Sequence, residues 1–189
     1  MKNVKVKIIS GLISASLLIP TITTLAEETT NTPSNGELTK QQKLENKQNL
    51  AQYKGTIKSK KAIIKENNAT LDSLRKEVSE KRATIKSLIS DVKENKKQLS
   101  KDDLSKIKAQ VQVIKNQTAA LASTKGTIKQ ALETMKNAIK NKSYQEAIAQ
   151  LDKIISIQNT RIDGLKKLST DMDTLISLLK TALTNAKTT

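Results

Sequence analysis

The sequence predicts an all-α protein, an elongated antiparallel three-helix bundle or coiled coil that follows a cleaved signal peptide. Aromatic side chains, which normally fill the core of a compact mixed domain, are scarce: the 189 residues include no Phe or Trp and only two Tyr. After Thr39 the chain contains no proline and three glycines, so helix breakers are rare. Apolar residues recur every seven positions over long stretches, which is the spacing of a coiled-coil seam.

The first 26 residues have the features of a secretory signal peptide. Three lysines form a basic start, residues 8–18 are apolar, and Pro20 ends a stretch that is short for a membrane span. Cleavage is expected after Ala26, and residues 27–37 form a flexible leader. The mature chain is therefore expected to be secreted, extracellular or periplasmic, and associated with the cell envelope.

A first helix is predicted over about 39–98. Eight apolar residues are spaced by seven without a slip, and we call them the seam: Leu50, Ile57, Ile64, Leu71, Val78, Ile85, Val92 and Leu99. The pair Asn67-Asn68 lies within this run and is a plausible turn signal. A turn would generally shift the phase of the seam, which stays constant, so one continuous helix is favoured over a hinge.

A second column follows the seam by three residues and is half polar. Its members are Tyr53, Lys60, Asn67, Leu74, Lys81, Leu88 and Asn95. A polar residue in such a column can fix register and partner number at a cost in stability. Leucine in place of Asn67 is therefore expected to raise thermal stability.

Two more helices are predicted, over about 101–140 and 143–186, within one helical domain that spans 38–189. Ser100 is a good N-cap, and two aspartates follow in the first turn, where the helix dipole favours negative charge. Ser143 and Glu146 have the spacing of a capping box. The short links between helices predict antiparallel neighbours.

The residue types exclude several kinds of catalytic site. Without His or Cys, the chain cannot build a histidine-based triad or a zinc site on those ligands. Asp171 and Asp173 resemble a metal-binding pair, but residues two apart on a helix do not face each other. The sequence therefore predicts a protein that is not an enzyme and that has no cofactor and no metal site.

The charge favours anionic partners. Cleavage of the signal peptide removes three lysines and no acidic residue, so the formal net charge of +16 falls to +13. Candidate contacts to an anionic surface are Lys58, Lys65, Lys76 and Lys86. The expected partners are anionic envelope polymers or protein clients, and a homodimer is possible.

Two other kinds of partner are not expected. Binding of nucleic acid is disfavoured because arginine and aromatic residues are scarce. Membrane insertion is disfavoured because Trp and Phe are missing. Solubility alone is an alternative explanation of the lysines.

The segment Leu38–Gln42, "LTKQQ", matches the L-T-x-x-Q signature of the LTxxQ (Spy/CpxP-like) family of exported helical proteins. Leu99–Asp103, "LSKDD", is a looser copy with Ser for Thr and Asp for Gln. This resemblance implies an exported, helical, basic protein. It also implies an alternative function, that of an ATP-independent periplasmic or extracellular chaperone that holds unfolded clients. The leading interpretation remains a non-enzymatic binding or scaffolding protein of the cell envelope.

Overall fold

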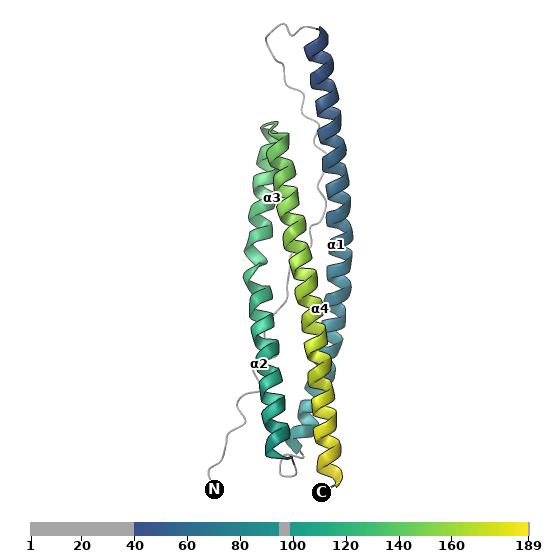
Figure 1. Ribbon diagram of the computed structural model, residues 1–189, viewed down its shortest axis with the longest axis vertical. Helices are drawn as coiled ribbons and strands as arrows, with labels where there is room; N and C mark the ends of the chain where they lie inside the picture. Colours follow the sequence, from purple (N-terminus) through teal and green to yellow (C-terminus); the bar gives the residue numbers. More distant parts are fainter. Residues whose placement is uncertain (1–39, 95–98, 189) are drawn as a thin grey trace. The chain divides into compact units, whose positions relative to one another are not determined.

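The computed structural model describes residues 40–94 and 99–188, and within these residues the structure is helical, without strands. The all-α class predicted from the sequence is thereby confirmed. The helices are α1 (Lys40–Glu94), α2 (Lys101–Ser123), α3 (Lys125–Lys140) and α4 (Tyr144–Thr188) (Figure 1). The predicted signal peptide, 1–26, and leader, 27–37, lie outside the described residues.

The described chain forms two compact units. Among the described residues, unit 1 consists of 70–94, 99–125 and 160–188, and unit 2 consists of 40–69 and 126–159. The helices α1 and α4 contribute to both units, α2 belongs to unit 1, and α3 belongs almost entirely to unit 2. Each unit therefore combines three helical segments, one of them supplied by α1, one by α4 and one by a shorter helix.

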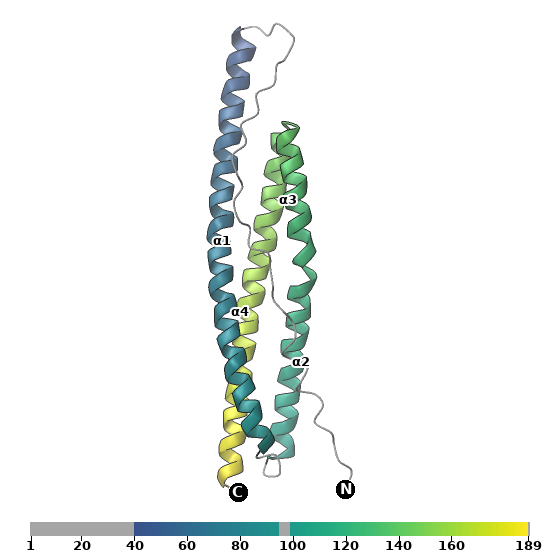
Figure 2. The ribbon, with the colours of Figure 1, turned by 180° about the vertical axis from the view of Figure 1, so that it is seen from behind.

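Each unit has its own apolar core. In unit 1 the core joins α1, α2 and α4, with Val78, Val111 and Leu168 among its buried members. In unit 2 the core joins α1, α3 and α4, and it includes Ile64 and Met135. Figures 1 and 2 show α3 alongside the first part of α4 in this unit. Aliphatic side chains and methionine fill both cores, which agrees with the lack of Phe and Trp.

The contacts between helices give their directions. Side chains of α1 meet side chains of α4 at a constant separation of 92 residues, both in unit 2 (Lys60 with Asp152) and in unit 1 (Lys81 with Asp173). A constant separation means that the two helices run parallel within each unit. In unit 1, Gln110 contacts Asp171 while the later Gln117 contacts the earlier Gly164, so α2 runs antiparallel to α4.

The segment predicted as one helix over about 101–140 is divided in the structure. Ser100 is the N-cap of α2, as predicted, and accepts a bond from the Asp103 backbone N–H, but α2 ends at Ser123 and α3 begins at Lys125. The Ser123 hydroxyl donates to the Ala120 carbonyl and the Thr124 hydroxyl to the Leu121 carbonyl. These two hydroxyls supply hydrogen bonds to carbonyl groups in the last turn of α2, where helical partners are missing.

The segment at Asn67-Asn68 is helical throughout, within α1. The sequence favoured this arrangement over a hinge because the phase of the seam is constant. The polar side chains here have partners on α4, described below, so they do not need a turn to satisfy them.

Candidate functional site

The seam contributes to both cores. Six of its eight residues are buried, while Leu50 and Leu99 at its ends are half-buried. The buried residues are Ile57 and Ile64 in unit 2 and Leu71, Val78, Ile85 and Val92 in unit 1. Leu99 packs against the core of unit 1. These side chains hold the helices together, so most of the seam offers no surface to a partner.

Asn95 of the second column lies outside the described residues, and the other four polar members each meet a polar residue of α4. We call these contacts the polar ladder. The pairs are Tyr53 with Gln145, Lys60 with Asp152 and Asn67 with Asn159 in unit 2, and Lys81 with Asp173 in unit 1. The half-polar column therefore has a structural purpose, because matched polar pairs favour one register of α1 against α4 within each unit.

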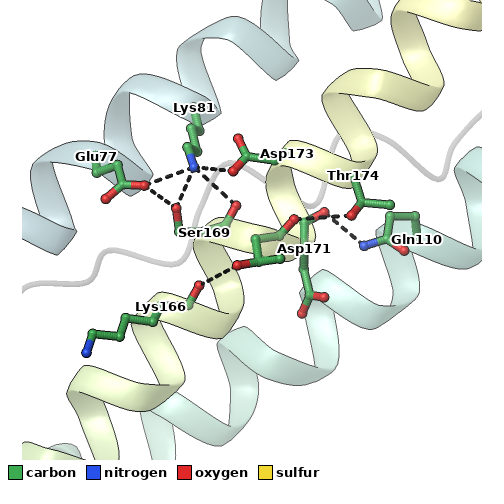
Figure 3. A network of polar contacts seen from close by, with 9 residues as sticks. Glu77, Lys81, Gln110, Lys166, Ser169, Asp171, Asp173 and Thr174 are labelled. Carbon is green, nitrogen blue, oxygen red and sulfur yellow. Dashed lines mark hydrogen bonds and ion pairs between the residues drawn. The ribbon is translucent and has the colours of Figure 1, made fainter.

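Lys81 joins several polar groups of unit 1 (Figure 3). Its ammonium group donates to the Ser169 hydroxyl and the Asp173 carboxylate, each at 2.6 Å, and lies 2.9 Å from the Glu77 carboxylate. Burial lowers the pKa of Lys81, but its hydrogen bonds to Asp173 and Glu77 outweigh burial and raise the pKa overall. Hydrogen bonds from Ser169, and then from Lys81, lower the pKa of Glu77. Both groups are held in their charged forms, which suits a structural ion pair better than proton transfer.

Gln158 of α4 is fully buried in unit 2. Its amide nitrogen donates to the Asn68 side-chain oxygen at 2.8 Å and to the Ile64 carbonyl at 3.3 Å, and its own oxygen accepts from the Asn67 amide at 3.3 Å. A buried amide without partners would destabilise the fold. The two asparagines therefore supply the hydrogen bonds that allow a glutamine inside this unit.

Arg161 is buried in unit 1, with 1 % of its surface exposed. Its guanidinium donates to the Leu121 carbonyl at 3.2 Å and to the Thr124 hydroxyl, at the C-terminal end of α2. The last turn of α2 contains no basic residue. Because a cation is favourable at a helix C-terminus, Arg161 provides from α4 the charge that α2 lacks. Burial, and then the nearby Arg75, lower the pKa of Arg161.

The paired carboxylates singled out in the sequence have separate structural partners. Asp173 binds Lys81, whereas the Asp171 carboxylate lies 3.3 Å from Lys167. In α2, Asp102 pairs with Lys106 at 2.6 Å. Among the described residues, no group of three or more His, Cys, Asp or Glu side chains could hold a metal ion. Asp102, Asp171 and Asp173 therefore each take part in an ion pair with a lysine.

The two tyrosines meet at a hollow of about 470 Å³ in unit 2. The rings of Tyr53 and Tyr144 stack with centroids 5.8 Å apart, and the Gln145 amide donates to the Tyr53 hydroxyl at 3.2 Å. Lys142 lies beside them in the left-handed conformation, with a φ of 58°, where the chain turns from α3 into α4. Because Tyr144 also packs against the unit 2 core, the pair covers one end of that core.

The four lysines predicted to contact anionic surfaces are all exposed on α1. Lys58 and Lys65 belong to unit 2, and Lys76 and Lys86 belong to unit 1. No ion pair joins any of the four to an acidic side chain within the described ranges. Their charges therefore face solvent, where an anionic partner has access to them.

None of the described helices combines the length and the apolar character that a membrane span requires. The chain matches no protein-family model, and no curated protein or solved structure is significantly similar to it.

Proposed function

We propose that this is an exported, non-enzymatic helical protein that binds or scaffolds components of the cell envelope through its lysine-rich faces. The proposal includes cleavage after Ala26 and assembly of residues 38–189 as a single three-helix bundle. In this mechanism the apolar seam holds the helices together, and exposed lysines attract anionic envelope polymers.

The exposure of lysines along α1 is the observation that carries the proposal. Lys58, Lys65, Lys76 and Lys86 are exposed, and the mature chain has a formal net charge of +13 once the signal peptide is removed. Lysine is a compact, strongly hydrated point charge, so it attracts polyanions without selecting one particular geometry. Binding of this kind is expected to be broad and electrostatic.

A salt series tests the proposal. The protein is expressed with its own signal peptide, and the N-terminus of the secreted material is sequenced, with Glu27 expected as its first residue. The secreted protein is then applied to an immobilised anionic wall polymer. Retention is expected to fall steeply with salt because the Debye length shrinks from ~30 Å at 0.01 M to ~8 Å at physiological ionic strength. Absence of retention at low salt, or retention that salt does not change, would refute electrostatic attachment.

A chaperone-like function is the second candidate, as the resemblance to the LTxxQ family implies. Three large apolar side chains are exposed on α1 and α2: Leu44, Ile63 and Val113, with 57 %, 43 % and 40 % of their surfaces accessible. Apolar contact with an unfolded client would survive moderate salt better than a purely ionic contact. Light scattering of a denatured client, with and without the protein, distinguishes the two functions, since a scaffold is not expected to suppress aggregation.

A further inference from the structure

One segment of α1, residues 46–65 in unit 2, contains six lysines and no acidic residue. Lys60 is paired with Asp152. The remaining five lie on one side of the helix, and we call them the lysine stripe: Lys47, Lys54, Lys58, Lys61 and Lys65. Their spacings of seven, four, three and four residues place them within an arc of about 60° at 3.6 residues per turn, over about 27 Å of helix.

The lysine stripe is open to solvent. Four of its members are exposed and Lys61 is half-buried. Within the part of the chain that the structure describes, no ion pair joins a stripe lysine to an acidic side chain. A row of ammonium groups without internal counterions concentrates positive potential along one line of the surface.

Solubility alone does not account for this arrangement. Lysines three or four residues apart on a helix repel each other, and the stripe contains three such steps, from Lys54 to Lys58, to Lys61 and to Lys65. In unit 1, by contrast, α1 places opposite charges at these spacings, as in Asp72 with Arg75 and Glu77 with Lys81. Interspersed charges keep a surface soluble without that repulsion. Repulsion within the stripe therefore lowers the stability of the helix, and a bound partner of opposite charge would relieve this repulsion.

We propose that the lysine stripe binds a linear polyanion that runs along α1. This inference rests on the proposed function and specifies its site. A single row of ammonium groups matches a single chain of anionic units, whereas a flat anionic membrane would engage a wider basic face. Because lysine has no fixed donor geometry, phosphate and carboxylate chains share the required chemistry.

Two variants with equal charge test the inference. In the stripe variant, all five stripe lysines become Gln. In the control variant, five exposed lysines outside the stripe and outside the four candidate contacts become Gln: Lys108, Lys129, Lys153, Lys166 and Lys180. Circular dichroism checks that each remains helical, and the stripe variant is expected to melt at a higher temperature because repulsion is relieved. The probes are long-chain polyphosphate, polygalacturonate and vesicles of phosphatidylglycerol with phosphatidylcholine.

We expect the stripe variant to lose about tenfold or more in affinity for both polymers, and to show a shallower salt dependence, because fewer counterions are released on binding. The control variant is expected to bind nearly as the wild type does.

Equal losses of affinity in both variants would overturn the stripe as the binding site while leaving electrostatic attachment intact. Wild-type protein that binds neither polymer at low salt would instead refute the proposed function. Vesicle binding as tight as polymer binding, and equally dependent on the stripe, would exclude a linear partner. Polyphosphate and polygalacturonate then show whether phosphate or carboxylate chains bind more tightly.

Discussion

Gln158 and Asn67 illustrate how single polar residues are accommodated in unit 2. Considered alone, Asn67 is a polar interruption of an apolar column, and its replacement by leucine was expected to stabilise the fold. The structure reverses this expectation, because the Asn67 amide donates to Gln158 and, at 3.0 Å, to Asn159. Gln158 has no exposed surface, so its oxygen has no access to water as a substitute partner.

Asn67→Leu is therefore predicted to lower the free energy of unfolding by about 1–3 kcal/mol, the typical cost of a buried polar group that loses its hydrogen-bond partner. Chemical denaturation followed by circular dichroism measures the change. Asn67→Leu combined with Gln158→Leu is the control, because replacement of both partners by apolar groups can be nearly neutral. A single variant more stable than the wild type would show that the hydrogen bonds of Asn67 contribute little.

At the scale of the helices, the bounds follow the sequence pattern closely, with one exception. The helices α2 and α4 begin directly after Ser100 and Ser143, the two residues recognised as N-terminal signals. The break at Thr124 was not visible because the heptad spacing continues across it: Leu121 and Ile128 are seven residues apart and both buried. Two hydroxyl bonds and the distant Arg161 supply hydrogen bonds at the end of α2, and none of these contacts leaves a periodic trace in the sequence.

Two helical glycines give opposite predictions for the same substitution. A Cβ atom at Gly55 of α1 would meet nothing within 4 Å, whereas a Cβ at Gly164 of α4 would lie 2.7 Å from Leu121 Cδ2. Gly55→Ala is therefore expected to stabilise the protein by about 0.5–1 kcal/mol through helix propensity. At Gly164 the same gain is opposed by overpacking, which typically costs about 1–3 kcal/mol, so Gly164→Ala is expected to destabilise.

Thermal melts of both alanine variants beside the wild type check this pair of predictions. The opposite directions make the test specific, since a general effect of alanine on helices would raise both melting temperatures. Stabilisation by Gly164→Ala would mean that Leu121, a buried residue of the unit 1 core, can move without loss of packing.

At the scale of the whole molecule, the sequence was sufficient to predict the helical class and the seam, but it was not sufficient to predict the contacts of the polar ladder. The residues that each helix contributes to the ladder are visible in the sequence as a column with a spacing of seven. The α1 column includes Lys60 and Lys81, and the α4 column includes Asp152 and Asp173. The sequence does not show that the two columns pair at a separation of 92 residues. That separation depends on the lengths of the intervening helices and on the break at Thr124. The lysine stripe, in contrast, lies within one helix, so the sequence alone could have predicted it. Of its five members, only Lys58 and Lys65 were among the candidate contacts predicted from the sequence.

The polar contacts around Lys81 also make the stability of the folded chain depend on pH. In unit 1 the pKa of Glu77 is lowered below its ordinary value of 4.5, so its contribution is present above that value and is lost as the pH falls through the lower, folded-state pKa. The pKa of Lys81 is raised above 10.5, so its contribution is present below that value and is lost as the pH rises through the higher pKa. Both contributions are therefore complete across the neutral range.

Glu77→Gln is expected to flatten the fall in unfolding free energy between about pH 5 and pH 3. The control is Glu133→Gln, which changes the charge by the same amount at an exposed residue. Urea denaturation at half-unit steps of pH measures both curves. If the two variants lose stability with acid in parallel with the wild type, the contacts of Glu77 with Ser169 and Lys81 do not contribute to acid stability.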